Sequence, residues 1–347
     1  MAAVDANVQI AHDPFLGMAE EDEKFYKGLA AKTLVTGLTY PITVVKTLIQ
    51  LGHEPFPLST GKIFVFCGRN AYFLPNGFSY AQQLAHAKGL SILWTGLDSA
   101  LVSFVVGGVA GHVATKFLND HYPAVGGSAE FEGKEEKNMT DHESFRRMLR
   151  AAIRDSTVRT FAVACARPFT VVCIRQVAQV IGGETKYQSV FHGLRLVGVE
   201  EGPGGLFSGF IPQLLGELLV IWGVHSLTYF AERAIIRSGL YEKAAENEQG
   251  QKELDDVRKA VHFIVPFVVN SAAYPYSVVS TVMAVAGSGL AVSFLPYSPA
   301  FPNWMNAWDY LKPHGLKRGA RLFLREQIGA VSVGSDKQLY ATNRHFV

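Results

Sequence analysis

Four ionisable residues lie inside apolar stretches that are long enough to cross a membrane. They are Lys46, Arg167, Arg175 and Glu217. A charge at the centre of a bilayer costs roughly 2.5–3.5 kcal/mol even on lenient insertion scales. We therefore expect these side chains to face a shared watery interior instead of lipid.

Polar residues accompany these charges at helical spacing, with steps of three and four residues that place side chains on one face. The interval 259–292 has such a stripe, and Gln213 lies four residues before Glu217. Snorkelling to headgroups remains an alternative for Lys32 and Arg159. We predict a hydrophilic groove whose electrostatics are set by Glu217 and Lys46. The full predicted lining is Lys46, Glu217, Arg167, Arg175, Gln213, Asn270, Thr43 and Gln50.

Enzymatic chemistry has little support in this sequence. The stretch "LSTGK" lacks the first glycine of a phosphate-binding loop, and no Ser/His/Asp or Cys/His grouping is recognisable. The three cysteines have neither zinc spacing nor a CxxC pair. The net charge of +2 argues against a nucleic-acid binder. We expect no catalytic residue, no metal and no cofactor.

Five stretches have spanning length at about 1.5 Å per residue across roughly 30 Å of hydrocarbon. They cover approximately 28–51, 95–118, 156–182, 206–236 and 259–292. The intervals 52–94 and 183–205 are mixed in polarity and suit short surface helices. The intervals 119–148 and 241–259 are rich in charge and are expected to be solvated loops, with extension of a helix into water as an alternative for 241–259.

An internal repeat organises these segments. Three strings, "YPITVVKTLIQ", "RPFTVVCIRQV" and "YPYSVVSTVMA", place Pro41, Pro168 and Pro275 in one pattern. A second repeated element occurs as "KGLSILWTGL" and "EGPGGLFSGF", and a decayed third copy occurs as "PHGLKRGARLF". It contains the equivalent glycines Gly89, Gly202 and Gly315, and Gly209 at the end of the second copy. Three tandem units, each nominally of two spans, are implied.

This layout resembles the mitochondrial solute carriers, whose repeat motif is Pro-x-Asp/Glu-x-x-Lys/Arg followed by Glu-Gly-x-x-x-x-aromatic-x-Gly. The resemblance implies a gate of acid–base pairs, but the acidic positions are Thr43, Thr170 and Ser277 here. The carrier cation survives only as Lys46. A gate of that kind therefore cannot form.

The chain more closely resembles the mitochondrial carrier homologue family of the outer membrane. The likeness rests on "YPITVVKTLIQLGHEPFP", "LPNGFSYAQ", "EEGPGGLFSGFIPQLLGELLVIW" and "VMAVAGSGLAVSFLPYSPAFPNWMNAW". It implies an all-α membrane protein with a carrier-like threefold repeat, about five transmembrane helices, a missing sixth and short surface helices. We divide the chain into an acidic tail (1–27), repeat 1 (28–118), a charged loop (119–148), repeat 2 (149–240), a truncated repeat 3 (241–325) and a C-terminal tail (326–347).

A missing sixth helix leaves a gap in the barrel wall beside the first and fifth spans, so their polar stripes would meet the bilayer. Such a groove lowers the barrier for moving polar groups into lipid. The resemblance implies insertion of tail-anchored and other α-helical proteins into the mitochondrial outer membrane, with links to lipid scrambling and apoptotic regulators. The expected partners are these clients and membrane lipids, with no nucleic acid. A metabolite transporter and a docking receptor for apoptotic proteins are the alternatives.

Overall fold

The computed structural model describes residues 20–63, 68–130, 133–293, 301–313 and 315–342. Cys67 and most of the acidic N-terminal tail lie outside these residues. Within them, five helices are long and apolar enough to cross a membrane, which confirms the predicted spans. They are α1 (Glu20–Leu51), α3 (Leu97–His121), α4 (Asp141–Gly182), α7 (Phe210–Arg237) and α9 (Glu248–Val285).

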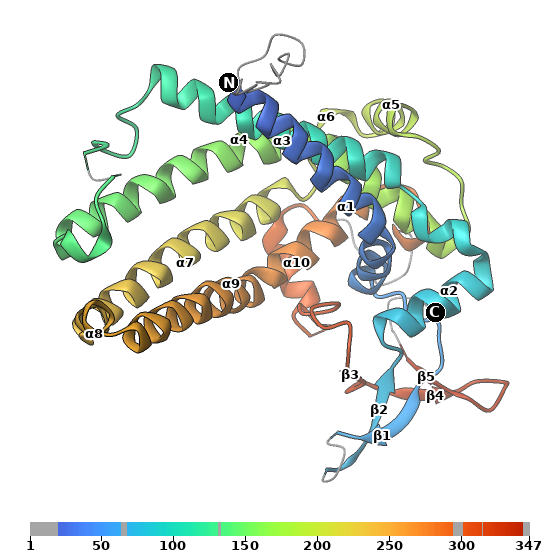
Figure 1. Ribbon diagram of the computed structural model, residues 1–347. Coiled ribbons are helices and arrows are strands. Elements are labelled where there is room, and N and C mark those ends of the chain that lie inside the picture. The colour runs from blue at the N-terminus through green and yellow to red at the C-terminus, as the bar shows by residue number, and fades with distance from the viewer. Residues whose placement is uncertain (1–19, 64–67, 131–132, 294–300, 314, 343–347) are drawn as a thin grey trace, which may run out of the picture.

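Shorter elements connect the long helices (Figure 1). The helices are α2 (Gly77–Lys88), α5 (Val190–Glu200), α6 (Gly202–Leu206), α8 (Leu240–Glu246) and α10 (Trp304–Leu311). Short 3-10 turns cover η2 (Leu90–Trp94), η3 (Glu136–Asn138) and η4 (Ala291–Ser293). Strands β1 (Ser59–Lys62), β2 (Asn70–Leu74) and β3 (Arg325–Glu326) form one antiparallel sheet, and β4 (Val331–Val333) pairs with β5 (Leu339–Ala341).

Helices α1, α4 and α9 begin earlier than the sequence predicts, whereas α9 ends at Val285 and not at residue 292. The interval 119–148 contains the end of α3 and the first turns of α4, which Thr140 begins with a capping box. The interval 241–259 contains most of α8 and the start of α9, so it is largely helical. Charged residues obscured these ends because a helix that leaves the membrane loses its apolar pattern.

The threefold repeat is visible in the surface helices. Helices α2, α5 and α10 begin after Asn76, Ser189 and Asn303, and each of these side chains accepts a hydrogen bond from the backbone N–H three residues later. Gly96 and Gly209, both left-handed, then begin α3 and α7. The third repeat therefore has its surface helix but no following span among the described residues.

A repeated contact joins each of these turns to a long helix. The residue before each repeat proline donates to the backbone carbonyl just before a left-handed glycine. The pairs are Tyr40 with Thr95 (2.8 Å), Arg167 with Ser208 (2.9 Å) and Tyr274 with Arg318 (2.8 Å). Gly319, which follows Arg318, has a φ of 74° like the glycines that begin α3 and α7. The third turn is thus preserved up to the point where a sixth span would start.

Small residues allow the spans to pack closely. An added Cβ at Gly107 would lie 3.3 Å from Ala166 of α4, and one at Gly108 would lie 2.8 Å from Leu29 of α1. Further out, His112 of α3 contacts Asp22 of α1 and His225 of α7 contacts Asp155 of α4, each at 2.8 Å. These contacts hold α3 against α1 and α7 against α4. Pro41, Pro168 and Pro275 lie inside continuous helices.

Candidate functional site: a groove between four spans

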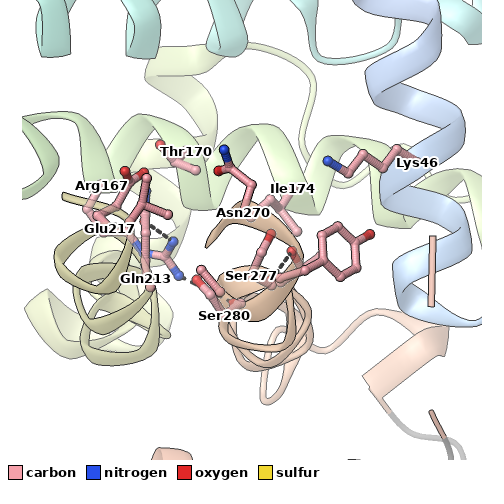
Figure 2. Close-up of a pocket in the computed structure, with 14 residues that line it drawn as sticks. Lys46, Arg167, Thr170, Ile174, Gln213, Glu217, Asn270, Ser277 and Ser280 are labelled. Carbon is pink, nitrogen blue, oxygen red and sulfur yellow. Dashed lines mark hydrogen bonds between the residues drawn. The ribbon is translucent and has the colours of Figure 1, made fainter. Parts of the chain in front are cut away.

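A groove of about 470 Å³ lies between α1, α4, α7 and α9 (Figure 2). Its lining is Lys46, Arg167, Thr170, Ile174, Gln213, Gly216, Glu217, Val220, Asn270, Ala273, Tyr274, Ser277, Ser280 and Thr281. Five of the eight predicted lining residues are in this set, namely Lys46, Glu217, Arg167, Gln213 and Asn270. Helix α3 contributes no residue to it.

Glu217 forms a two-pronged ion pair with Arg159. The Nε and Nη2 atoms of Arg159 donate to the two carboxylate oxygens at 3.1 and 2.8 Å. The pair joins α4 to α7, and both side chains are partly exposed. Arg159 therefore pairs with a carboxylate inside the bundle, whereas the snorkelling alternative would place its charge among the lipid headgroups. The available signal was an arginine in one apolar stretch and an acid in the next, both at positions where a charge is unfavourable in lipid.

Arg167 is buried and fully committed to hydrogen bonds. Its guanidinium donates to the carbonyl of Ser208, to Oε1 of Gln213 at 2.5 Å and to the carbonyl of Ser280 at 3.4 Å. It therefore ties α4 to α7 and α9 at the floor of the groove. No carboxylate among the described residues forms an ion pair with it.

Lys46 reaches into the groove from α1 and lies 5.2 Å from the centre of the Tyr274 ring. Figure 2 shows it pointing toward Asn270, with Arg167, Gln213 and Glu217 on the far side. The amide of Asn270 donates to the carbonyl of Pro266, one turn earlier, at 2.7 Å. Among the described residues no carboxylate pairs with Lys46. The lining contains two cations, Lys46 and Arg167, and one carboxylate, Glu217, so its net charge is positive.

Three predicted lining residues lie elsewhere. Arg175 is fully buried with Glu201 and the carbonyl of Ala284. Eight residues past Arg167 place it about 12 Å further along α4, beyond the groove. Thr43 lies one turn before Lys46 on α1, but its side chain is exposed and it is not part of the lining. Gln50 is buried beneath the groove.

Gln50 closes one end of the groove. Its amide donates to Tyr274 (3.0 Å) and Ser277 (3.4 Å) of α9 and accepts from Thr281 (3.1 Å). The predicted gap beside α1 and α9 is therefore partial, because their C-terminal halves are joined by uncharged hydrogen bonds. This network was missed because the sequence does not show which polar faces meet.

The opposite end is open at the side. In the part of the chain that the structure describes, no hydrogen bond or ion pair joins residues 28–45 of α1 to residues 248–273 of α9. Figure 1 shows the two helices separating away from α10. Apolar side chains are exposed on these parts of both helices, with Leu38 81% exposed on α1 and Phe263 76% exposed on α9. Exposed apolar side chains on helices that also line a polar groove are expected where such a groove meets lipid.

Comparison with known proteins decides the family. The pattern of mitochondrial carrier proteins matches residues 148–234, which cover most of repeat 2. Mitochondrial carrier homolog 2 of Homo sapiens is 33% identical over 294 residues, which are 84% of this chain and 91% of that protein. The chain belongs to the mitochondrial carrier homologue family.

A second relative agrees with this assignment. Mitochondrial carrier homolog 1 of Mus musculus is 31% identical over 310 residues, covering 87% of this chain and 75% of that protein. Two features of this mitochondrial carrier homologue depart from the solute-carrier motif. No sixth span follows α10 among the described residues, and the hydrogen bonds at the closed end are uncharged. Family membership and five candidate spans indicate a multi-pass membrane protein.

Proposed function

We propose that this protein inserts tail-anchored and other α-helical proteins into the mitochondrial outer membrane, through the groove between α1, α4, α7 and α9. The observation that carries the proposal is a polar groove between candidate spans, in which hydrogen bonds join α1 to α9 at one end. We infer that the groove meets lipid where these two helices separate. A client tail must bring polar groups into the bilayer, and burying such groups without partners is unfavourable. The groove offers those groups hydroxyls, amides and charged side chains. Passage of lipid headgroups along the same surface is a related activity.

The lining suits transient contact better than tight binding. Glu217 is neutralised by Arg159, and Arg167 is occupied by carbonyls and Gln213. Lys46 and Asn270 remain as the polar tips that project into the space (Figure 2). A surface with few unsatisfied groups can accept a polar chain without holding it. This favours passage over a stable complex.

The alternatives receive less support. A solute transporter must open both ends of its cavity in turn, whereas the C-terminal halves of α1 and α9 are joined here by hydrogen bonds without a charged gate. A docking receptor was expected to use the charged intervals 119–148 and 241–259. Part of the first interval is folded against the bundle instead, where Glu136 pairs with Arg147 and Arg233.

Reconstitution tests the proposal. Purified protein in liposomes is supplied with a tail-anchored client, and the fraction of the client tail that becomes protease-protected is measured. We expect protected insertion above that of empty liposomes and of liposomes with an unrelated helical membrane protein. Equal protection in all three would contradict the proposal. Uptake of radiolabelled metabolites by the same vesicles would favour a transporter.

A further inference from the structure

The chain after α10 takes over the place where a sixth span would begin. Tyr274 of α9 donates to the carbonyl of Arg318 at 2.8 Å, and Gly319 follows in the left-handed conformation. In repeats 1 and 2 the same turn leads into a transmembrane helix. Here residues 315–341, which we call the C-terminal arm, continue as turns and short strands.

The arm fills the corner between the first and fifth spans. A Cβ added to Gly319 would lie 3.0 Å from the hydroxyl of Tyr274 and 3.4 Å from both Ile49 and the carbonyl of Lys46. The backbone at this point therefore touches α9 and α1 at once. It lies beside the hydrogen bonds of Gln50 that close the groove.

The arm is fastened to repeat 1 further along. The amide of Gly77 donates to the carbonyl of Leu322 at 2.7 Å, and the side chain of Leu322 packs on the cluster around Tyr40. Strand β3 adds to β2, with Leu74 opposite Arg325. The arm thus joins the end of the third repeat to the start of the first, so the ring of repeats is complete at this end.

A buried ion pair holds the arm in place. Arg325 pairs with Glu54, and both side chains are only 7% exposed. Arg325 also donates to the carbonyl of Pro75 at 3.0 Å. Burial raises the pKa of the Glu54 carboxyl, and it lowers the pKa of Arg318 to about 10.

Glu54 is central to this charge cluster. Its Oε2 atom and the Nε and Nη1 atoms of Arg318 are buried without hydrogen-bond partners. Arg325 pairs with this carboxylate, and the charge of Arg318 is near enough to favour its ionised form. Removing its charge leaves two buried cations without compensation, which is far more unfavourable than losing an exposed pair.

We propose that the C-terminal arm is a seal. It replaces the sixth span at the closed end of the groove and prevents small ions from crossing a protein whose side is open to lipid. Glu54 and Arg325 are the residues that hold the seal. This function is independent of client insertion, because the arm touches the closed end and the proposed client path lies at the open side.

The test uses the full chain in phosphatidylcholine vesicles loaded with potassium, with efflux as the readout. Glu54→Gln is combined with Gly77→Cys and Leu322→Cys, in a background where the three native cysteines are replaced by alanine. A Cβ at Gly77 would lie 3.1 Å from that of Leu322, so this pair can be cross-linked with little movement. Oxidation then fastens the arm again, and reduction releases it.

We expect the reduced variant to leak potassium roughly a hundredfold faster than the unsubstituted protein, the order of population change for one missing partner of a buried pair. Oxidation should restore the slow rate. Arg69→Gln is the matched control, because the Arg69–Glu326 pair joins the same region but its arginine is 74% exposed. That variant should remain tight.

Several outcomes would overturn the seal. Equal leakage in the oxidised and reduced states would mean that the arm does not control the barrier. A tight reduced variant would refute the proposal too. If the reduced variant is tight, the rate of disulfide formation between positions 77 and 322 tells the two explanations apart. A slower rate would show that the arm detaches without affecting leakage. An unchanged rate would show that Glu54 does not hold the arm. Client insertion by the same vesicles is measured in parallel, so failure of the seal and failure of insertion are distinguishable.

Discussion

Replacing Glu217 by arginine should make insertion depend on the charge of the client tail. The substitution changes the charge at this position by two units and places two arginines in contact, since Arg159 is the partner of Glu217. We take a charge on the client tail that passes about 10 Å from residue 217, in a wet groove of effective dielectric about 40. Each unit of charge at residue 217 then changes the interaction energy by about 0.8 kcal/mol. Two units give about 1.7 kcal/mol, or a roughly 15-fold change in rate.

The assay compares two clients that differ only in carrying one lysine or one glutamate in the translocated tail. Glu217→Arg should slow the lysine client and accelerate the glutamate client, and Glu217→Gln should give about a fourfold effect in the same directions. The ion pair is partly exposed, so its loss should alter the free energy of unfolding by about 1 kcal/mol or less. Lys46→Glu should produce the opposite charge preference.

Glu253→Arg is the matched control, because it makes the same charge change at an exposed position of α9 outside the lining. It should leave both clients unaffected. Equal slowing of both clients by Glu217→Arg, in protein that unfolds at the normal temperature, would refute the reasoning. It would mean that Glu217 acts through packing and not through groove electrostatics.

Three further predictions concern stability and are measured by thermal unfolding in detergent. Arg175→Leu should lower the free energy of unfolding by about 3 kcal/mol, because it leaves Glu201 without its buried partner; a change under about 1 kcal/mol would contradict this. Gly209→Ala should cost about 1–3 kcal/mol, since φ is 68° and the new Cβ would lie 2.5 Å from the Ser280 carbonyl; Gly183→Ala, where an added Cβ meets open space, is the control. Burial lowers the pKa of His53 to about 4, below the unfolded value of about 6.5. Its contribution is therefore present above about pH 6.5 and is lost as the pH falls toward 4, so the stability of His53→Gln should vary less over this range; an equal pH dependence would be the contrary result.

The spans and the repeat could be predicted from sequence because both depend on local pattern. Apolar stretches of spanning length and the Pro41, Pro168 and Pro275 motifs needed no knowledge of tertiary contacts. Lys46 and Glu217 were also predictable as groove residues, since a charge in an apolar span has few acceptable surroundings. Asn270 followed from its position on the same helical face as other polar residues.

Pairing across helices could not be predicted in the same way. Arg175 and Arg167 look alike in sequence, yet one meets Glu201 below the groove and the other binds Gln213 at its floor. Gln50 appeared to be lining but closes the end against α9. The strands and the arm were also missed, because β1 and β2 are short and polar and Arg325 meets Glu54 only after the chain has returned to repeat 1.

The central claim is that clients enter the bilayer through this groove, and site-specific cross-linking during insertion tests it most directly. A photoreactive residue at Asn270, in the lining, is compared with one at Val113 on the exposed face of α3, with both proteins active in reconstituted insertion. We predict that the transmembrane segment of the client cross-links to position 270 while it is being inserted and not to position 113. Efficient insertion without cross-links at 270, or with equal cross-links at both positions, would contradict the account.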